Sequence, residues 1–205
     1  MIKLPELLAP AGSSQALRAA IAAGADAVYL SGKRFGARKF APNFDHPSLA
    51  EAIDYAHLRG VKVYVTVNTL VREDELLDLA EYLIELYELG ADAILLQDLG
   101  AAALASELVP DLERHASTQM TIHNALGVKY LEEMGVKRVV LARETTREEI
   151  RQIKQAVPGM ELETSEEVHV ICLFPDIDKA MKMQDIVYDA LPPLENREDI
   201  FGEQL

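Results

Sequence analysis

A cluster of cations between residues 31 and 43 is the first feature of the sequence that could carry chemistry. The segment holds two glycines and four cations, which are Lys33, Arg34, Arg38 and Lys39. Glycines let backbone amides approach a ligand and cations neutralise negative charge, so the composition is typical of an anion site. A solvated basic loop whose aromatic side chains rest on the rim of the fold explains the same residues. The sequence leaves both interpretations open.

A polar segment at residues 114–119 is the second candidate. In a strand over residues 115–119, His115, Ser117 and Gln119 would share one face. A serine near a histidine suggests a nucleophile with its base, so His115 and Ser117, with Asp98 after the preceding strand, are the catalytic candidates. The alternative is a strand near the mouth of a barrel whose polar groups pair internally. Strands covered on both faces are normally apolar, so the polarity indicates a cavity lining.

Polar residues also follow several other expected strands. Ligands of parallel α/β folds bind beyond the carboxyl ends of the strands, and converging polar groups at one rim indicate a pocket. No metal site is expected there. The residues that we expect to contact a substrate are Lys33, Arg34, Arg38, Asn43, Asn68, Gln119, Arg143 and Glu144.

The elements that position these residues alternate between strand and helix, which predicts a parallel sheet with helical crossovers. Glycines at the expected helix ends, such as Gly24 and Gly90, separate the units. A capping box of Thr145 and Glu148 is expected to begin the last of the six helices. The expected strands are residues 6–9, 25–30, 61–67, 93–96, 115–119 and 138–142.

The predicted fold class is therefore α/β, a parallel (β/α) barrel-like domain over residues 1–163. With six or seven β-α units it falls short of the eight of a complete barrel, so we expect it to be incomplete. Residues 164–205 form a divergent acidic tail with one possible strand, residues 168–173, and one helix. An incomplete barrel would leave an open strand edge, through which two copies of the chain could pair as a homo-oligomer.

Composition limits the function classes. The net charge of −14 opposes non-specific binding to nucleic acid or to anionic lipid. The amino terminus has no signal-peptide pattern and no apolar run is long enough to cross a bilayer, so a cytoplasmic protein without membrane contact is expected. The single cysteine, Cys172, excludes an internal disulfide and cannot alone hold zinc or an iron-sulfur cluster. We expect no cofactor from these residues.

Five long segments, in order along the chain, resemble the collagenase-like peptidase family, the thirty-second family of peptidases of unknown catalytic type. The resemblance covers residues 1–163 and implies a barrel-like domain in proteins named as peptidases. It also implies a link to oxygen-independent hydroxylation of tRNA, ribosomal RNA or ubiquinone precursors, which other members carry out with a four-cysteine iron-sulfur cluster. In the tRNA branch, prephenate is the implied partner substrate. The segments are residues 5–13 (PELLAPAGS), 24–30 (GADAVYL), 34–38 (RFGAR), 55–64 (YAHLRGVKVY) and 115–120 (HASTQM).

The chain departs from this family after residue 163. Members normally continue with a strand that carries a His-Gly-Ala-x-Cys phrase and then further cysteines. Here His169 and Cys172 fall near the expected place, but the phrase is broken and no second cysteine follows. The resemblance therefore does not supply the four ligands of an iron-sulfur cluster.

Three hypotheses follow from the sequence. The first is a collagenase-like peptidase-family protein, a hydrolase by family name, whose barrel binds an anionic small molecule, a peptide or RNA at the strand ends. The second is a fragment or relative of the hydroxylation proteins that act on RNA or ubiquinone precursors, without their cluster ligands. The third is a non-catalytic domain that dimerises through the open barrel edge.

Overall fold

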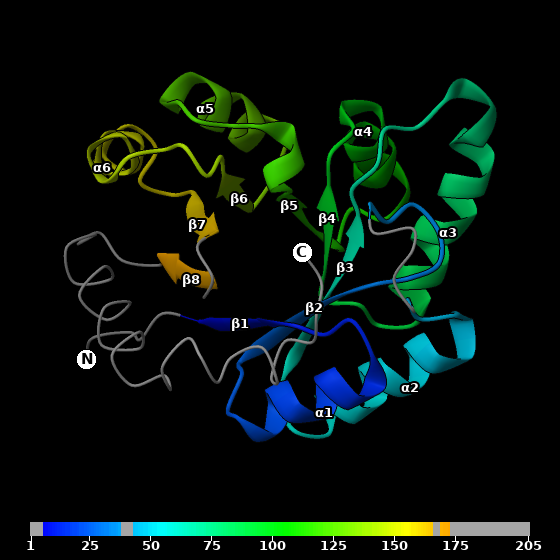
Figure 1. The fold of residues 1–205 in the computed structure, drawn as a ribbon. Coiled ribbons are helices and arrows are strands. Elements are labelled where there is room, and N and C mark those ends of the chain that lie inside the picture. The colour runs from blue at the N-terminus through cyan, green and yellow to red at the C-terminus, as the bar shows by residue number, and fades with distance from the viewer. Residues whose placement is uncertain (1–5, 38–42, 166–168, 173–205) are drawn as a thin grey trace.

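The fold is a closed barrel of eight strands in the order β1 to β8, seen in a computed structural model that describes residues 6–37, 43–165 and 169–172. Strands β1 to β7 pair with their neighbours in parallel, and helices lie outside the ring of strands (Figure 1). The strands are β1 (Leu7–Pro10), β2 (Ala27–Ser31), β3 (Lys62–Val67), β4 (Ala93–Leu96), β5 (Glu113–Ala116), β6 (Arg138–Leu141), β7 (Glu161–Ser165) and β8 (His169–Cys172).

Helices connect the successive parallel strands, as the alternation of the sequence predicts. The α-helices are α1 (Ser14–Ala22), α2 (His46–His57), α3 (Leu76–Glu88), α4 (Leu99–Leu108), α5 (Ala125–Glu133) and α6 (Arg147–Ala156), and two 3₁₀ turns are η1 (Glu73–Glu75) and η2 (Thr118–Met120). The capping box of α6 lies one residue later than predicted, at Thr146 and Glu149. There the Thr146 Oγ1 accepts from the Glu149 N–H at 3.3 Å, and the Glu149 carboxylate accepts from the Thr146 N–H at 2.8 Å.

The α/β barrel-like class is confirmed, but closure of the ring differs from the prediction. The seventh parallel strand is β7, and the segment predicted as the seventh strand forms β8. Strand β8 runs antiparallel to both β7 and β1, so it closes the sheet without a further helical crossover. The strand edge that the sequence offered for dimerisation is therefore occupied within the same chain. The expected boundary after residue 163 falls inside β7, and the helix expected in the tail lies outside the described residues.

The same four residues, Gly-Ala-Asp-Ala, occur at two helix-to-strand junctions, residues 24–27 and 90–93, and help to hold neighbouring strands together. Gly24 and Gly90 end α1 and α3 with φ values of 94° and 81°, a left-handed conformation that glycine adopts without strain. Two residues later, Asp26 accepts from the Leu7 N–H at 2.8 Å and Asp92 accepts from the Val63 N–H at 2.7 Å. Each aspartate thus holds the start of the preceding strand in the sheet.

The apolar core lies mainly between the strands and the helices, where buried Leu, Ile, Val and Ala side chains form two clusters. The barrel interior has a smaller apolar cluster of Leu8, Ala27, Tyr64, Ala93 and Leu95. Polar side chains share this interior: the His115 ring packs edge-on against the Tyr64 ring with 4.9 Å between centroids. In the described part of the chain, no helix is long and apolar enough to cross a membrane.

Candidate functional site

Asn68 joins three segments at the carboxyl ends of the strands, the end of the barrel that we call the mouth. Its side-chain oxygen accepts from the Ala37 N–H at 3.0 Å, and its Nδ2 donates to the Ser117 Oγ at 3.4 Å. Thr69 Oγ1 also donates to the Phe35 carbonyl at 3.2 Å. The ends of β3 and β5 and the loop after β2, far apart in sequence, are thus held together as the strand-end rule predicts.

Ser117 and His115 do not form a nucleophile and base pair in this geometry. The Ser117 Oγ contacts Asn68 and accepts from the Gln119 N–H at 3.3 Å. His115 is 1% exposed and lies in the barrel interior, with Nε2 3.6 Å from the Glu113 carboxylate, beyond hydrogen-bond distance. Burial lowers the pKa of His115, so the ring is neutral near pH 7.

Asp98 has a structural role at the mouth. Its Oδ1 accepts from the Ala101 N–H at 2.9 Å and caps α4, and its Oδ2 lies 3.4 Å from the Val71 N–H that donates to it. A side-chain cap of this kind satisfies a free amide of the first helical turn. The carboxylate therefore fixes the start of α4 relative to the loop after β3.

Gln119, Arg143 and Glu144 are exposed at the mouth, after β5 and β6. The η2 turn that carries Gln119 is tied to β6 because Thr118 Oγ1 donates to the Leu141 carbonyl at 3.4 Å. Arg143 makes no hydrogen bond or ion pair with any of the residues that the structure describes. Its guanidinium therefore has no counterion within the described part of the chain.

The two described cations of the loop after β2, Lys33 and Arg34, each have an acidic partner. Lys33 forms an ion pair with Asp45 at 3.2 Å, and Arg34 forms one with Glu85 of α3 while its guanidinium lies 4.4 Å from the centre of the Tyr82 ring. Arg38 lies outside the described residues. Asn43 has a φ of 30° and precedes Phe44, whose backbone pairs with Ser31 and Lys33.

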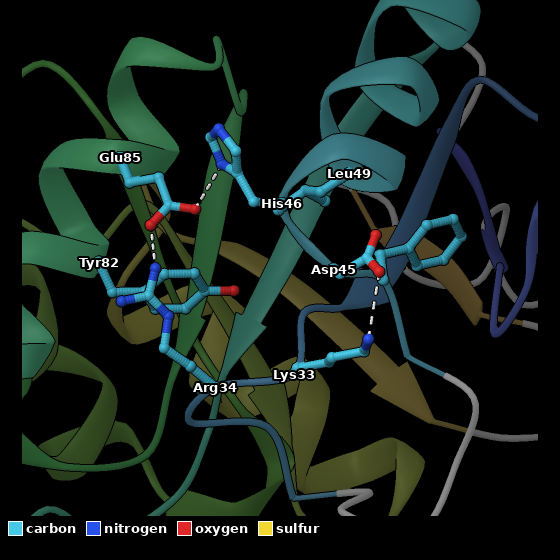
Figure 2. Close-up of a pocket in the computed structure, with 8 residues that line it drawn as sticks. Lys33, Arg34, Asp45, His46, Leu49, Tyr82 and Glu85 are labelled. Carbon is cyan, nitrogen blue, oxygen red and sulfur yellow. Dashed lines mark hydrogen bonds and ion pairs between the residues drawn. The ribbon is translucent and has the colours of Figure 1, made fainter.

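A cavity of about 140 Å³ lies between this loop, the start of α2 and the middle of α3 (Figure 2). His46 Nδ1 is 2.7 Å from the second oxygen of Glu85. Tyr82 is 2% exposed, and burial raises the pKa of its hydroxyl to about 12. Lining residues that the sequence did not indicate are Phe44, Asp45, His46, Leu49, Tyr82 and Glu85.

The opposite end of the barrel holds a charged network that sequence reasoning also missed. Arg138 donates to Glu6 at 3.0 Å and to Glu161 at 2.7 Å, and Tyr64 donates to the same Glu6 oxygen at 2.7 Å. Burial raises the pKa of Glu6, but the charge of Arg138 and these hydrogen bonds outweigh it, so the pKa is lowered overall. The network lies at the starts of the strands, away from the mouth, and its role is to hold β1, β3, β6 and β7 together.

No group of three or more His, Cys, Asp or Glu side chains within the described ranges is placed to hold a metal ion. Cys172 lies in β8, and it is the single cysteine of the sequence. The donor set therefore does not fit a four-cysteine iron-sulfur cluster.

Comparison with known proteins agrees with this architecture. The family model of Peptidase family U32 matches residues 12–169. The chain belongs to this family. A solved U32 peptidase structure superposes with a TM-score of 0.70 at 15% identity, covering 100% of this chain and 86% of that chain, which shows a shared fold.

Two curated relatives of this U32-family chain carry names that refer to RNA. The chain is 42% identical to a 23S rRNA 5-hydroxycytidine synthase of Escherichia coli, in a match that covers 74% of this chain. It is 40% identical to tRNA hydroxylation protein P of the same organism, in a match that covers 78% of this chain. The matches span 22% and 35% of those relatives. The chain therefore spans about a fifth of the length of the first relative and about a third of the length of the second.

Proposed function

We propose that this chain acts as the barrel domain of an RNA-hydroxylation protein and binds RNA at its mouth. The relatives named for rRNA and tRNA hydroxylation support the substrate class. The proposal assigns the chain the binding and positioning of RNA and no chemical step, because its one cysteine does not fit the ligand set of the family's cluster.

The observation that carries the proposal is Arg143. It is exposed at the end of β6, and no carboxylate among the described residues neutralises it, in contrast to Lys33 and Arg34. A guanidinium can bind a phosphate through two parallel hydrogen bonds. The exposed amide of Gln119 on the neighbouring β5–η2 segment offers a donor and an acceptor for the edge of a base.

The peptidase alternative has less support from the geometry. A serine nucleophile needs a base within hydrogen-bond reach, and the contacts of the Ser117 Oγ are an asparagine amide and a backbone N–H. Peptide hydrolysis through Ser117 therefore stays a prediction of the sequence without a base beside it in the described structure.

Arg143→Ala tests RNA binding at the mouth. If Arg143 contacts one phosphate, the variant is expected to weaken the binding of unmodified tRNA and to reduce the slope of log K against log salt concentration by about one. The slope is measured by filter binding or fluorescence anisotropy over a series of salt concentrations, starting low because the chain is acidic.

Glu144→Gln is the matched control, since the residue is adjacent and also exposed. Removing its negative charge is expected to leave the affinity unchanged or to raise it. An unchanged salt slope in Arg143→Ala, or an equal loss of affinity in both variants, would contradict RNA binding at this site.

A further inference from the structure

The segment that carries α3 and α4 is strongly acidic. Residues 73–113 contain 12 Asp and Glu residues and no Lys, Arg or His. On the outer sides of the two helices, Glu81, Glu88 and Glu107 are exposed and form no ion pair with any residue that the structure describes. The outer surface of α3 and α4 is therefore negative, and no cation of the same segment offsets its charge.

The same segment exposes large apolar side chains. Leu77, Ile84 and Tyr87 of α3 are 81%, 41% and 46% exposed, and their spacings of seven and three residues place them along one face of the helix. Leu108, at the end of the neighbouring α4, is 41% exposed. We call these four side chains the α3–α4 face. Single exposed apolar residues are ordinary, but a row of them within a polar rim is typical of an interaction surface.

The α3–α4 face is separate from the cavity beside α2. Glu85 of α3 pairs with Arg34 and His46 on the α2 side of the helix. A helix has 3.6 residues per turn, so Ile84 and Tyr87 point away from Glu85. Helices α3 and α4 pack against each other outside the strands (Figure 1). No residue of the face lines the cavity, so the two surfaces are available to different ligands.

Acidic side chains border the apolar residues at close range. Glu81 lies one turn from both Leu77 and Ile84, and Glu88 lies one turn after Ile84. Interfaces commonly combine an apolar centre with a polar rim, and complementary charge across the rim selects the partner. A partner for this face therefore presents apolar side chains flanked by Lys or Arg.

Charge disfavours the other occupants of such a face. A second copy of the chain would bring the same acids opposite Glu81 and Glu88, and like charges placed together across an interface are costly. Residues 173–205 of this chain hold eight acids and three bases, so they have the same sign as the face. RNA and anionic lipids are repelled for the same reason.

From these observations we propose that the α3–α4 face docks a basic amphipathic helix of a partner protein. Apolar side chains on one face of that helix pack on Ile84 and Tyr87, and its flanking Lys or Arg residues pair with Glu81 and Glu88. Helix α3 has 13 residues and is about 20 Å long, so a partner helix of about four turns covers it. The proposal adds a protein partner to the RNA proposed at the mouth.

The test is the binding of a fluorescently labelled helical peptide to the full chain, followed by fluorescence anisotropy. The peptide has about 15 residues, with leucines on one helical face and lysines on the other. A second peptide has glutamate in place of lysine and keeps the same apolar face. We expect saturable binding of the Leu/Lys peptide and no binding of the Leu/Glu peptide.

Leu77→Ser tests the apolar part of the face and is expected to weaken binding of the Leu/Lys peptide about fivefold or more. Leu126→Ser on α5 is the matched control and is expected to bind the peptide unchanged. Both leucines are 81% exposed, and each is the second residue of its helix. Substitutions at such exposed positions change stability little, so both variants are expected to fold.

Glu81→Lys tests the acidic rim and is expected to weaken binding roughly five- to tenfold. Glu133→Lys on α5 is the control, because Glu133 is also exposed and its replacement changes the net charge by the same amount. Absence of saturable binding of the Leu/Lys peptide, equal binding of the Leu/Glu peptide, or equal losses in a variant and its control would overturn the proposal. Self-association of the natural chain that Leu77→Ser abolishes, seen by analytical ultracentrifugation, would also overturn it, since the occupant would then be a second copy.

Discussion

Arg138→Ala is expected to lower the free energy of unfolding by about 3–5 kcal/mol. The Arg138 side chain is 3% exposed and pairs with Glu6, whose side chain is 12% exposed. Removing the guanidinium leaves the buried Glu6 carboxylate with the half-exposed Lys62 ammonium, 3.6 Å away, as its remaining countercharge among the described residues. The loss of a buried partner of this kind costs more than the pair itself contributes. Glu161 is 37% exposed, so water replaces much of its lost interaction and Glu6 accounts for most of the effect. Urea unfolding followed by circular dichroism measures the change.

Two further variants show whether the expected loss of stability comes from the buried charge or from removing any arginine. Arg151→Ala breaks an i, i+3 ion pair with Glu148 on the surface of α6 and is expected to cost at most about 0.5 kcal/mol. Adding Glu6→Gln to Arg138→Ala removes the buried charge that has lost its arginine partner and is expected to recover part of the loss. Equal losses in Arg138→Ala and Arg151→Ala would show that the network contributes little.

Local chemistry explains why most of the barrel could be predicted. Gly24 and Gly90 end their helices, and the expected strand at residues 93–96 is β4 itself. Such signals act within a few residues, so the sequence displays them directly. The one-residue error at the α6 cap has the same origin, because Thr145 and Thr146 each have a glutamate three residues later.

Strand β7 and the closure of the barrel were not predictable in the same way. The sequence of β7 is ELETS, with Leu162 as its one large apolar residue, whereas a strand covered on both faces is expected to be apolar. The Glu163 side chain is nevertheless 2% exposed, because the barrel interior is polar near His115. Pairing of β8 with β1 joins residues about 160 positions apart, and no local pattern reports such a contact.

The candidate site, like the fold, could be predicted only where local position in the sequence decides the outcome. The strand-end rule located Asn68, Ser117 and Arg143, since position in a parallel strand fixes the end of the barrel at which a residue lies. It did not show that Glu85, 51 residues from Arg34, neutralises that cation. The Tyr82 hydroxyl was missed because a tyrosine on the apolar face of a helix gives no sign of whether its oxygen finds a partner.

Lowering the pH below about 6.5 is expected to destabilise the fold, and His115→Gln is expected to remove most of the first part of that loss. Burial holds the pKa of folded His115 below the value of about 6.5 that an unfolded histidine has. Between these two values the unfolded chain binds a proton that the folded chain does not, so stability rises with pH in this window and falls as the pH is lowered through it. Below the folded pKa this contribution to the slope ends.

A second loss follows at lower pH because the pKa of folded Glu6 is also lowered. Its contribution is present above about pH 4.3, where an unfolded glutamate titrates, and is lost as the pH falls through the folded pKa. The two windows can be separated by urea unfolding at a series of pH values, with exposed His123 replaced by Gln as the control. If the natural chain and His115→Gln lost stability with the same slope just below about pH 6.5, the interior histidine could not be the group that titrates.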